Sequence, residues 1–281
     1  MGDRVVERSV DRVAERSVDR VAERSVDRVA ERSVDRVAER SVDRVAAHPG
    51  DRVPEPLPAI LLCGGRGTRL AGDGESESAD TPPGGPIDAS AEKPLVRVDD
   101  EPMVDRVIRA LRQSDAVGTI HAVASPHTPG TLAHLRSVAD RLATGTDRTA
   151  LIPRKGSGEG YVADLQAALA DVGRPAITVV ADLPLLRAEH VSAAVDHARR
   201  NAENGSLTVC VPVATKRDLG VSVDTTMTVA DARVAPTGLN VVGRAAADEA
   251  AEDEAVRIVD DPALAVNVNR PGDLRVARRR S

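Results

Sequence analysis

Residues 59–70 read A-I-L-L-C-G-G-R-G-T-R-L, an apolar run followed directly by a glycine-rich turn with two arginines. The run from Ile60 to Leu62 stops at Gly64 and Gly65, which predicts a buried strand that ends in a tight turn. Glycine backbones can turn successive N–H groups toward an anion, and the arginines add positive charge. The spacing is neither G-x-x-x-x-G-K-[ST] nor G-x-G-x-x-G. We predict a triphosphate-binding turn, with an ordinary turn as the alternative; its residues are Gly64, Gly65, Arg66, Gly67, Thr68 and Arg69.

A lysine beyond this turn is the next candidate. The chain has 38 lysine and arginine residues, but only Lys93, Lys155 and Lys216 are lysines. Lys93 follows residues 71–91, an acidic segment rich in Gly, Pro and Ser that is expected to be a flexible insertion. Its compact ammonium can reach between phosphate oxygens. Lys93 is therefore a candidate catalytic residue, and a solvated surface lysine is the alternative.

An aspartate at the end of a second apolar strand completes the set of charged candidates. Residues 176–181 form a continuous apolar run that leads directly into Asp182-Leu183-Pro184. Ligands of open α/β sheets bind beyond the carboxyl ends of the strands, where a carboxylate can coordinate Mg²⁺ that bridges nucleotide phosphates. The alternative for Asp182 is a helix cap or turn position.

The order of apolar periodicities predicts the fold class. Predicted strands at 60–62, 92–98, 119–124, 150–152, 176–181, 206–211, 236–242 and 263–268 alternate with predicted helices at 103–112, 132–142, 162–169, 190–200 and 245–254 and one from Pro271, and 212–231 is less regular. Such alternation implies a Rossmann-like α/β domain with a mainly parallel sheet and helices on both faces. The candidate residues all fall at strand ends, so we expect them to converge on one edge of the sheet.

The N-terminal region is organised differently. Residues 8–46 repeat R-S-V-D-R-V-A-E with a period of eight. Eight residues overshoot two helical turns by about 80°, so the valines spiral around a helix and do not form a heptad stripe. We expect a helical or disordered arm at 1–50, a proline-rich linker at 51–58, and a domain at 59–281. The arm is either an incidental tandem duplication or an oligomerisation or docking arm, and a homodimer is among the assemblies left open.

Composition limits the partners. The chain has no Phe or Trp and one tyrosine, Tyr161, so base recognition is expected to use hydrogen bonds and aliphatic packing. Its formal net charge of −6 argues against nucleic-acid binding. No apolar stretch approaches the ~20 residues of a membrane span. Cys63 and Cys210 are far apart and are expected to be reduced core residues in a cytoplasmic protein.

Several motifs resemble known enzymes. L-L-C-G-G-R-G-T-R-L followed by E-K-P-L resembles the nucleotidyltransferases that include sugar-phosphate and molybdopterin nucleotidyltransferases. The segments S-P-H-T-P-G-T, G-E-G-Y-V-A-D-L, V-V-A-D-L-P-L-L, P-T-G-L-N-V-V and N-V-N-R-P-G-D-L come after them in that order. Together they resemble the archaeal GTP:adenosylcobinamide-phosphate guanylyltransferases over roughly residues 57–275. Two departures are Cys63, where the pattern usually has Ala, and the insertion at 71–91.

The resemblance implies a fold of the nucleotide-diphospho-sugar transferase type and roles for individual residues. Residues 64–69 would hold the triphosphate of GTP, and Lys93 would neutralise charge at the α-phosphate, with Arg69 and Asp182 as further catalytic candidates. Asp182 would bind Mg²⁺, and Asn267 or Asn269 would give a second metal contact. Gly238 and Asn240 would line the nucleotide or corrinoid side, and Ser125 and Thr128 are candidate guanine readers.

The implied reaction joins GTP and adenosylcobinamide phosphate to give adenosylcobinamide-GDP and pyrophosphate in cobalamin biosynthesis. A phosphate nucleophile needs no deprotonation, so alignment and charge stabilisation suffice. The alternatives are a nucleotidyltransferase acting on molybdopterin or a sugar phosphate, and a non-catalytic nucleotide-binding scaffold that works through the repeat arm.

Overall fold

The computed structural model describes residues 55–65, 70, 92–145, 149–201, 205–244 and 255–281. The predicted arm, the insertion at 71–91 and the predicted helix at 245–254 lie outside the described residues, as do Arg66, Gly67, Thr68 and Arg69. The first strand begins at Leu57, so Leu57 and Pro58 of the predicted linker belong to the sheet.

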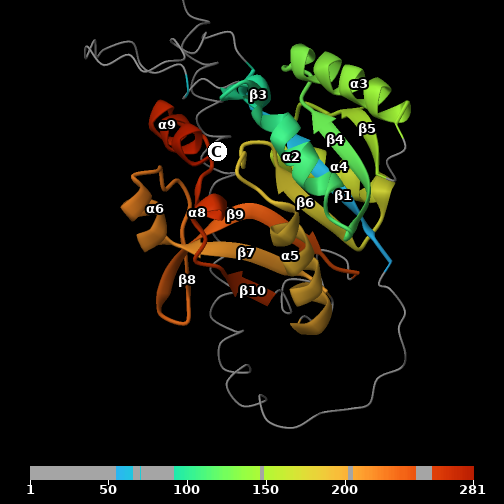
Figure 1. Cartoon of the computed structure of the whole chain (residues 1–281). Helices are drawn as coiled ribbons and strands as arrows, with labels where there is room; N and C mark the ends of the chain where they lie inside the picture. The colour runs from blue at the N-terminus through green and yellow to red at the C-terminus, as the bar shows by residue number, and fades with distance from the viewer. Residues whose placement is uncertain (1–54, 66–69, 71–91, 146–148, 202–204, 245–254) are drawn as a thin grey trace, which may run out of the picture.

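The described residues form an eight-stranded sheet, and seven of its strands follow the order β10-β7-β9-β6-β1-β4-β5, with β8 paired to β9 (Figure 1). The strands are β1 (Leu57–Cys63), β4 (Val117–Ala124), β5 (Ala150–Lys155), β6 (Ala176–Val180), β7 (Leu207–Pro212), β8 (Met227–Val229), β9 (Ala232–Val242) and β10 (Ala255–Ile258). Strands β5, β4, β1 and β6 are parallel neighbours, whereas β9 runs antiparallel between β6 and β7. The prediction of a mainly parallel α/β sheet is therefore confirmed.

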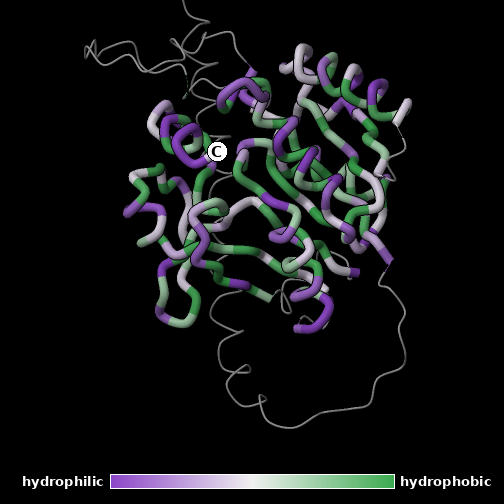
Figure 2. Tube along the Cα trace, viewed as in Figure 1, coloured by the Kyte–Doolittle hydropathy of each residue, from purple (hydrophilic) through white to green (hydrophobic). Residues whose placement is uncertain are grey.

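Helices cover both faces of the sheet, as predicted. The main helices are α2 (Met103–Arg112), α3 (Pro129–Ala143), α4 (Tyr161–Val172) and α5 (Ala188–Asn201). Side chains alternate along β1, so Leu61 packs with residues of α2, α3 and α5, whereas Ile60 and Leu62 pack with residues of α4. In Figure 2 hydrophobic residues predominate along the central strands. Burial on both faces explains why the strand sequences are continuously apolar.

A second, smaller core lies beside the sheet. It joins Leu70, Val96 and Met103 to Val268 and Leu274 of the C-terminal segment. The elements around it are the 3₁₀ turn η1 (Lys93–Leu95), the hairpin of β2 (Arg97–Val98) and β3 (Glu101–Pro102), α6 (Val213–Leu219), α8 (Pro262–Ala265) and α9 (Pro271–Arg280). This core holds the segment that carries Lys93 close to the one that carries Asn267 and Asn269.

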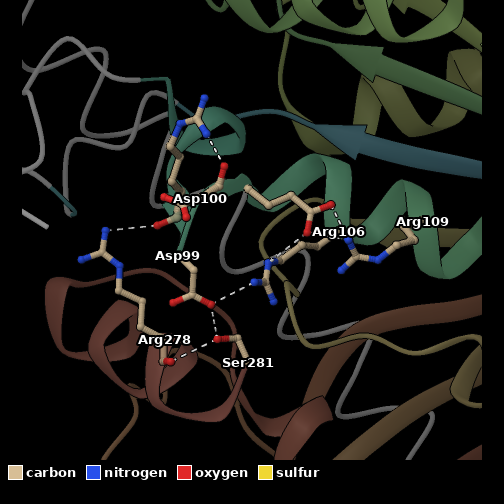
Figure 3. Close-up of polar contacts among 8 residues, drawn as sticks. Asp99, Asp100, Arg106, Arg109, Arg278 and Ser281 are labelled. Atoms are coloured by element: carbon tan, nitrogen blue, oxygen red, sulfur yellow. Dashed lines mark hydrogen bonds and ion pairs between the residues drawn. The ribbon is translucent and has the colours of Figure 1, made fainter. Parts of the chain in front are cut away.

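Polar contacts also tie α9 to the β2–β3 hairpin (Figure 3). The Ser281 hydroxyl donates to Asp99, and Arg278 Nη2 donates to the Arg97 carbonyl at 3.1 Å. Arg106 reaches the same Asp99 carboxylate from α2 at 3.1 Å. Because most buried residues of α2 belong to the main core and those of α9 to the second core, this network links the two cores.

Three sequence predictions of local structure are wrong. The predicted strand at 92–98 contains the 3₁₀ turn η1, and only Arg97–Val98 form a strand, because Pro94 lies in the first turn of η1. The predicted strand at 263–268 begins instead as helix α8, because Pro262 occupies its first turn and Asp261 Oδ1 accepts the Ala263 N–H at 2.7 Å as a cap. The predicted irregular segment at 212–231 contains α6 and β8. No helix in the described ranges combines the length and apolar character needed to cross a membrane.

Candidate active site

A pocket of about 390 Å³ opens at the carboxyl ends of the central parallel strands. Its floor is formed by Leu62 of β1, Val123 of β4 and Val180 of β6. Leu62 is in register with both valines, so three aliphatic side chains from adjacent strands lie at one level. Such a floor can pack against the flat face of a base or sugar but offers it no side-chain hydrogen bond.

The glycine turn after β1 forms one rim of the pocket, as predicted. Both Gly64 and Gly65 line it, and Gly65 has a φ of +112°, a conformation that disfavours other residues. A Cβ at Gly65 would lie 3.4 Å from Lys93 Cδ, so the turn and the lysine are in close contact. The nucleotide-binding roles of these glycines stay predictions.

Lys93 is fixed by the residues on either side of it. The Glu92 carboxylate accepts the backbone N–H groups of Gly130, at 2.8 Å, and of Thr131, and so caps the N-terminus of α3. Pro94 is buried after it. The motif E-K-P-L therefore places one charged side chain at the pocket while its neighbours anchor the backbone.

Lys93 and Asp182 meet at the pocket wall. The ammonium of Lys93 donates to Asp182 Oδ2, and also to Asn269 Oδ1 at 2.6 Å. The side chains of Lys93 and Asp182 are only 14% and 18% exposed, so solvent screens their attraction less than at an open surface. The two residues singled out from the sequence are thus brought together, and their catalytic roles stay predictions.

Asn267 lies behind Asp182 and is itself held by a lysine. Its Nδ2 donates to the Thr237 carbonyl at 2.9 Å and makes a longer contact of 3.4 Å to Asp182 Oδ1. Its Oδ1 accepts from Lys216 Nζ at 3.1 Å. We call Lys93, Asp182, Asn267, Asn269 and Lys216 the lysine–carboxylate cluster.

Lys216 was not predicted as a site residue. It is 4% exposed, and burial lowers its pKa, while the carboxylates of Asp273, Asp182 and Asp224 oppose that shift. The only signal in the sequence is the rarity of lysine in an arginine-rich chain, and this signal does not say which partner the lysine meets.

A second glycine-rich turn, before α4, forms the opposite rim. Asp164 Oδ1 accepts the Ser157 N–H at 2.5 Å and the Ser157 hydroxyl at 2.7 Å, which ties the turn to the helix. The adjacent Tyr161, the one aromatic residue of the chain, lines the pocket and is 49% exposed. Burial raises the pKa of its hydroxyl, and the negative charge of Asp182 raises it further. The sequence predicted no aromatic side chain at the pocket, and neither Tyr161 nor Asp164 was among the predicted site residues.

The remaining predicted residues lie at different depths. Ser125 lines the pocket together with His127. Thr128 is fully buried behind that loop, and its hydroxyl donates to the Ser125 carbonyl at 3.0 Å. The guanine-reading roles of Ser125 and Thr128 stay predictions.

Gly238 and Asn240 lie on β9, next to the pocket wall. A Cβ at Gly238 would lie 2.4 Å from Val180 Cγ2, so this glycine allows β9 to pack behind the pocket floor. Asn240 Nδ2 donates to Thr178 Oγ1 at 3.3 Å. Thr178 pairs with Asn240 across the sheet and lies two residues before Val180, where β6 ends. Their contact with a nucleotide or corrinoid stays a prediction.

The site fits one common mode of Mg²⁺ binding. Within the described residues there is no group of three or more His, Cys, Asp or Glu side chains that could hold an ion alone. Mg²⁺ is often held by one or two carboxylates together with substrate phosphates and water, and Asp182 faces the pocket where phosphates would lie. The amide oxygens of Asn267 and Asn269 accept from lysines, and the metal roles of all three residues stay predictions.

Comparison with known proteins agrees with this geometry. A model of the MobA-like NTP transferase domain matches residues 59–260. The adenosylcobinamide-phosphate guanylyltransferase of Methanocaldococcus jannaschii is 25% identical over 223 residues, covering 78% of this chain and 94% of that protein.

Solved structures show the same fold at lower identity. CMP:2-keto-3-deoxy-manno-octonic acid synthetase complexed with CTP is 14% identical with a TM-score of 0.51, covering 80% of this chain and 98% of that one. A glucose-1-phosphate thymidylyltransferase structure from Bacillus anthracis is 15% identical with a TM-score of 0.50, covering 78% and 94%. The fold is thus of the nucleotide-diphospho-sugar transferase type, and the chain belongs to the MobA-like NTP transferase family, as a nucleotidyltransferase.

Proposed function

We propose that this nucleotidyltransferase is a GTP:adenosylcobinamide-phosphate guanylyltransferase. The observation that carries the proposal is the convergence of Lys93, Asp182 and the Gly64–Gly65 turn on one pocket at the strand ends. The choice of substrates is supported by the M. jannaschii relative, which is named for this activity and is matched over 94% of its length.

In the proposed reaction an oxygen of the acceptor phosphate forms a bond to the α-phosphorus of GTP. The bond between that phosphorus and the oxygen bridging to the β-phosphate breaks, and pyrophosphate leaves with its electron pair. The attacking phosphate is already an anion at neutral pH, so the protein supplies in-line alignment and compensation of charge.

The pocket suggests how the chain's residues would divide this work. The glycine turn would accommodate the phosphates, and the aliphatic floor would lie against the nucleoside. The Lys93 ammonium, now bonded to Asp182 and Asn269, would turn toward the α-phosphate when the nucleotide enters. There its positive charge would offset the negative charge that develops in the transition state.

Asp182 would hold Mg²⁺ together with nucleotide phosphates and water. The ion would neutralise charge on the departing pyrophosphate.

The decisive experiment supplies α-³²P-labelled GTP with adenosylcobinamide phosphate, molybdopterin or a sugar phosphate in turn. We expect label to move to adenosylcobinamide phosphate alone, with one pyrophosphate released per transfer. Transfer to another acceptor would refute the substrate while keeping the reaction class. Binding of GTP with no pyrophosphate from any acceptor would favour a non-catalytic scaffold, which deletion of residues 1–50 would then test by loss of partner binding.

A further inference from the structure

Lys216 is a buried cation outside the pocket with two defined acceptors. It lies on α6, and its Nζ donates to the Ala265 carbonyl at 2.8 Å and to Asn267 Oδ1 at 3.1 Å. It is 4% exposed and is not one of the residues that line the pocket. Burying a charge costs solvation free energy, so we expect the role of Lys216 to lie in the groups that its ammonium binds.

What it holds is the segment between α8 and α9. This segment touches both Lys93 and Asp182, because Val268 N–H donates to the Asp182 carbonyl at 2.9 Å and Asn269 Oδ1 accepts from Lys93 at 2.6 Å. Residues 266–270 form neither helix nor strand, so no repeating hydrogen bonds of regular structure fix them. Their placement depends on individual contacts. Lys216 provides two of these, one to Ala265, the last residue of α8, and one to Asn267.

Lys216 and two acceptors together hold the Asn267 amide. A lysine ammonium can only donate, so it binds the amide oxygen of Asn267 and leaves Nδ2 on the other side. That Nδ2 donates to the Thr237 carbonyl and contacts Asp182 Oδ1. Without Lys216 the amide oxygen would lose its donor, and the Asn267 side chain would be held from one side alone.

We propose that Lys216 is a positioning residue for nucleotidyl transfer, which sets the alignment of Asp182 and Lys93 through Asn267 and the 265–269 segment. The inference rests on the proposed function for its substrates. It assigns Lys216 no contact with nucleotide or acceptor, so its effect should fall on steps after nucleotide binding. A lysine that only stabilised the fold would leave the folded enzyme's turnover intact.

The kinetic test is a double-mutant cycle of Lys216→Met and Asn267→Ala, measured by acceptor-dependent pyrophosphate release. Each single change should lower kcat by about tenfold or more while the KM for GTP changes by less than about threefold. Because the two act in one chain of contacts, the double variant should stay within about twofold of the worse single variant.

The matched control is Arg217→Met. Arg217 is the exposed neighbour of Lys216 on α6, so this change removes the same charge from the same helix without the buried contacts. It should keep kcat within about twofold of the wild type. If Lys216→Met does not fold, as judged by circular dichroism, Asn267→Ala carries the test. It keeps Lys216 and its bond to the Ala265 carbonyl, and it removes the side-chain contacts of Asn267 to Lys216, Thr237 and Asp182.

A binding readout separates this inference from the substrate assignment. The affinity of the wild type, Lys216→Met and Arg217→Met for mant-labelled GTP is measured in the presence of Mg²⁺. It should stay within about threefold of the wild type in both variants, because each keeps all the residues that line the pocket. Failure of the proposed substrates appears as no product with adenosylcobinamide phosphate, which leaves this readout in place.

Three results would overturn the proposal: wild-type kcat in either folded single variant, additive losses in the double variant, or a loss of GTP affinity in Lys216→Met well above about threefold.

Discussion

The pocket floor and the lysine–carboxylate cluster stand side by side but are specified in different ways. Leu62, Val123 and Val180 each lie at the end of a parallel strand, and their registry follows from the sheet itself. The cluster instead joins Lys93 to Asn269, which is 176 residues further along the chain. The floor is thus a direct product of secondary structure, whereas the cluster exists only once the second core has formed.

This difference predicts different consequences of substitution. Changes to the floor and its rims should act on nucleotide binding and on stability together, because the same packing serves both. Changes to the cluster should act on turnover, because in the proposed reaction its groups would lie next to developing charge. Substitutions in each region, paired with matched controls, test that division.

The largest effect is expected from Lys93→Ala and Asp182→Ala. Each should lower kcat/KM by at least tenfold, above about 1.4 kcal/mol, and removal of a preorganised charge commonly reaches on the order of 10²-fold. Steady-state pyrophosphate release with GTP and acceptor measures the loss. Near-normal turnover in either variant would remove the cluster from the chemistry.

The control for this pair is Arg109→Ala, which breaks an ion pair with Glu101 whose partners are 51% and 30% exposed. An exposed pair contributes only about 0–1 kcal/mol, so this variant should keep its activity and nearly all its stability.

Gly238→Ala should lower stability and weaken nucleotide binding together. The residue has φ +84°, and the new Cβ would lie 2.4 Å from Val180 Cγ2, so both backbone strain and overpacking of the floor oppose it. The combined cost is expected to be roughly 2–4 kcal/mol by urea denaturation, with a raised KM for GTP.

Gly173→Ala provides the comparison at a site with similar φ, +86°, and no atom within 4 Å of the added Cβ. It should lose only the backbone strain, roughly 1–3 kcal/mol, because its ψ of 177° also lies in a region that favours glycine. Equal losses in the two variants would show that contact with the floor is unimportant.

The smallest effect is expected from Asp164→Ala. This change frees the Ser157 N–H and hydroxyl that hold the second glycine turn, at a cost of about 1–2 kcal/mol. If that turn borders the nucleotide, KM for GTP should rise by about fivefold while kcat changes less. Asp171→Asn on the same helix, an exposed carboxylate paired with Arg154, should leave both parameters unchanged. A drop in kcat with an unchanged KM would instead show that Asp164 acts on turnover, as we expect of the lysine–carboxylate cluster.

The sequence was informative where local pattern and function coincide. Apolar strands that end in Gly64 and in Asp182 could be recognised from periodicity, and parallel topology then required that their ends meet. Lys93 stood out because lysine is rare in this chain. All of these are properties of a short window or of composition.

The rest could not be predicted because it depends on contacts between distant segments. Nothing near Lys216 indicates that it meets Asn267, and nothing near Glu92 indicates that it caps α3. The segment at 263–268 was assigned to a strand from its apolar residues, yet Pro262 and the Asp261 cap begin a helix there. Local capping outweighed the apolar pattern.

The anchoring of Glu92 has a consequence for how such sequences can diverge. Leu70 is 2% exposed in the second core, and the Glu92 carboxylate is held by the backbone of α3. The stretch at 71–91 therefore starts and finishes at tethered points, and the neighbouring ammonium is located by Glu92 and the buried Pro94. Lengthening or trimming that stretch should leave Lys93 where it is, which makes the stretch a natural place for lineages to gain or lose residues and for an experimenter to insert a tag.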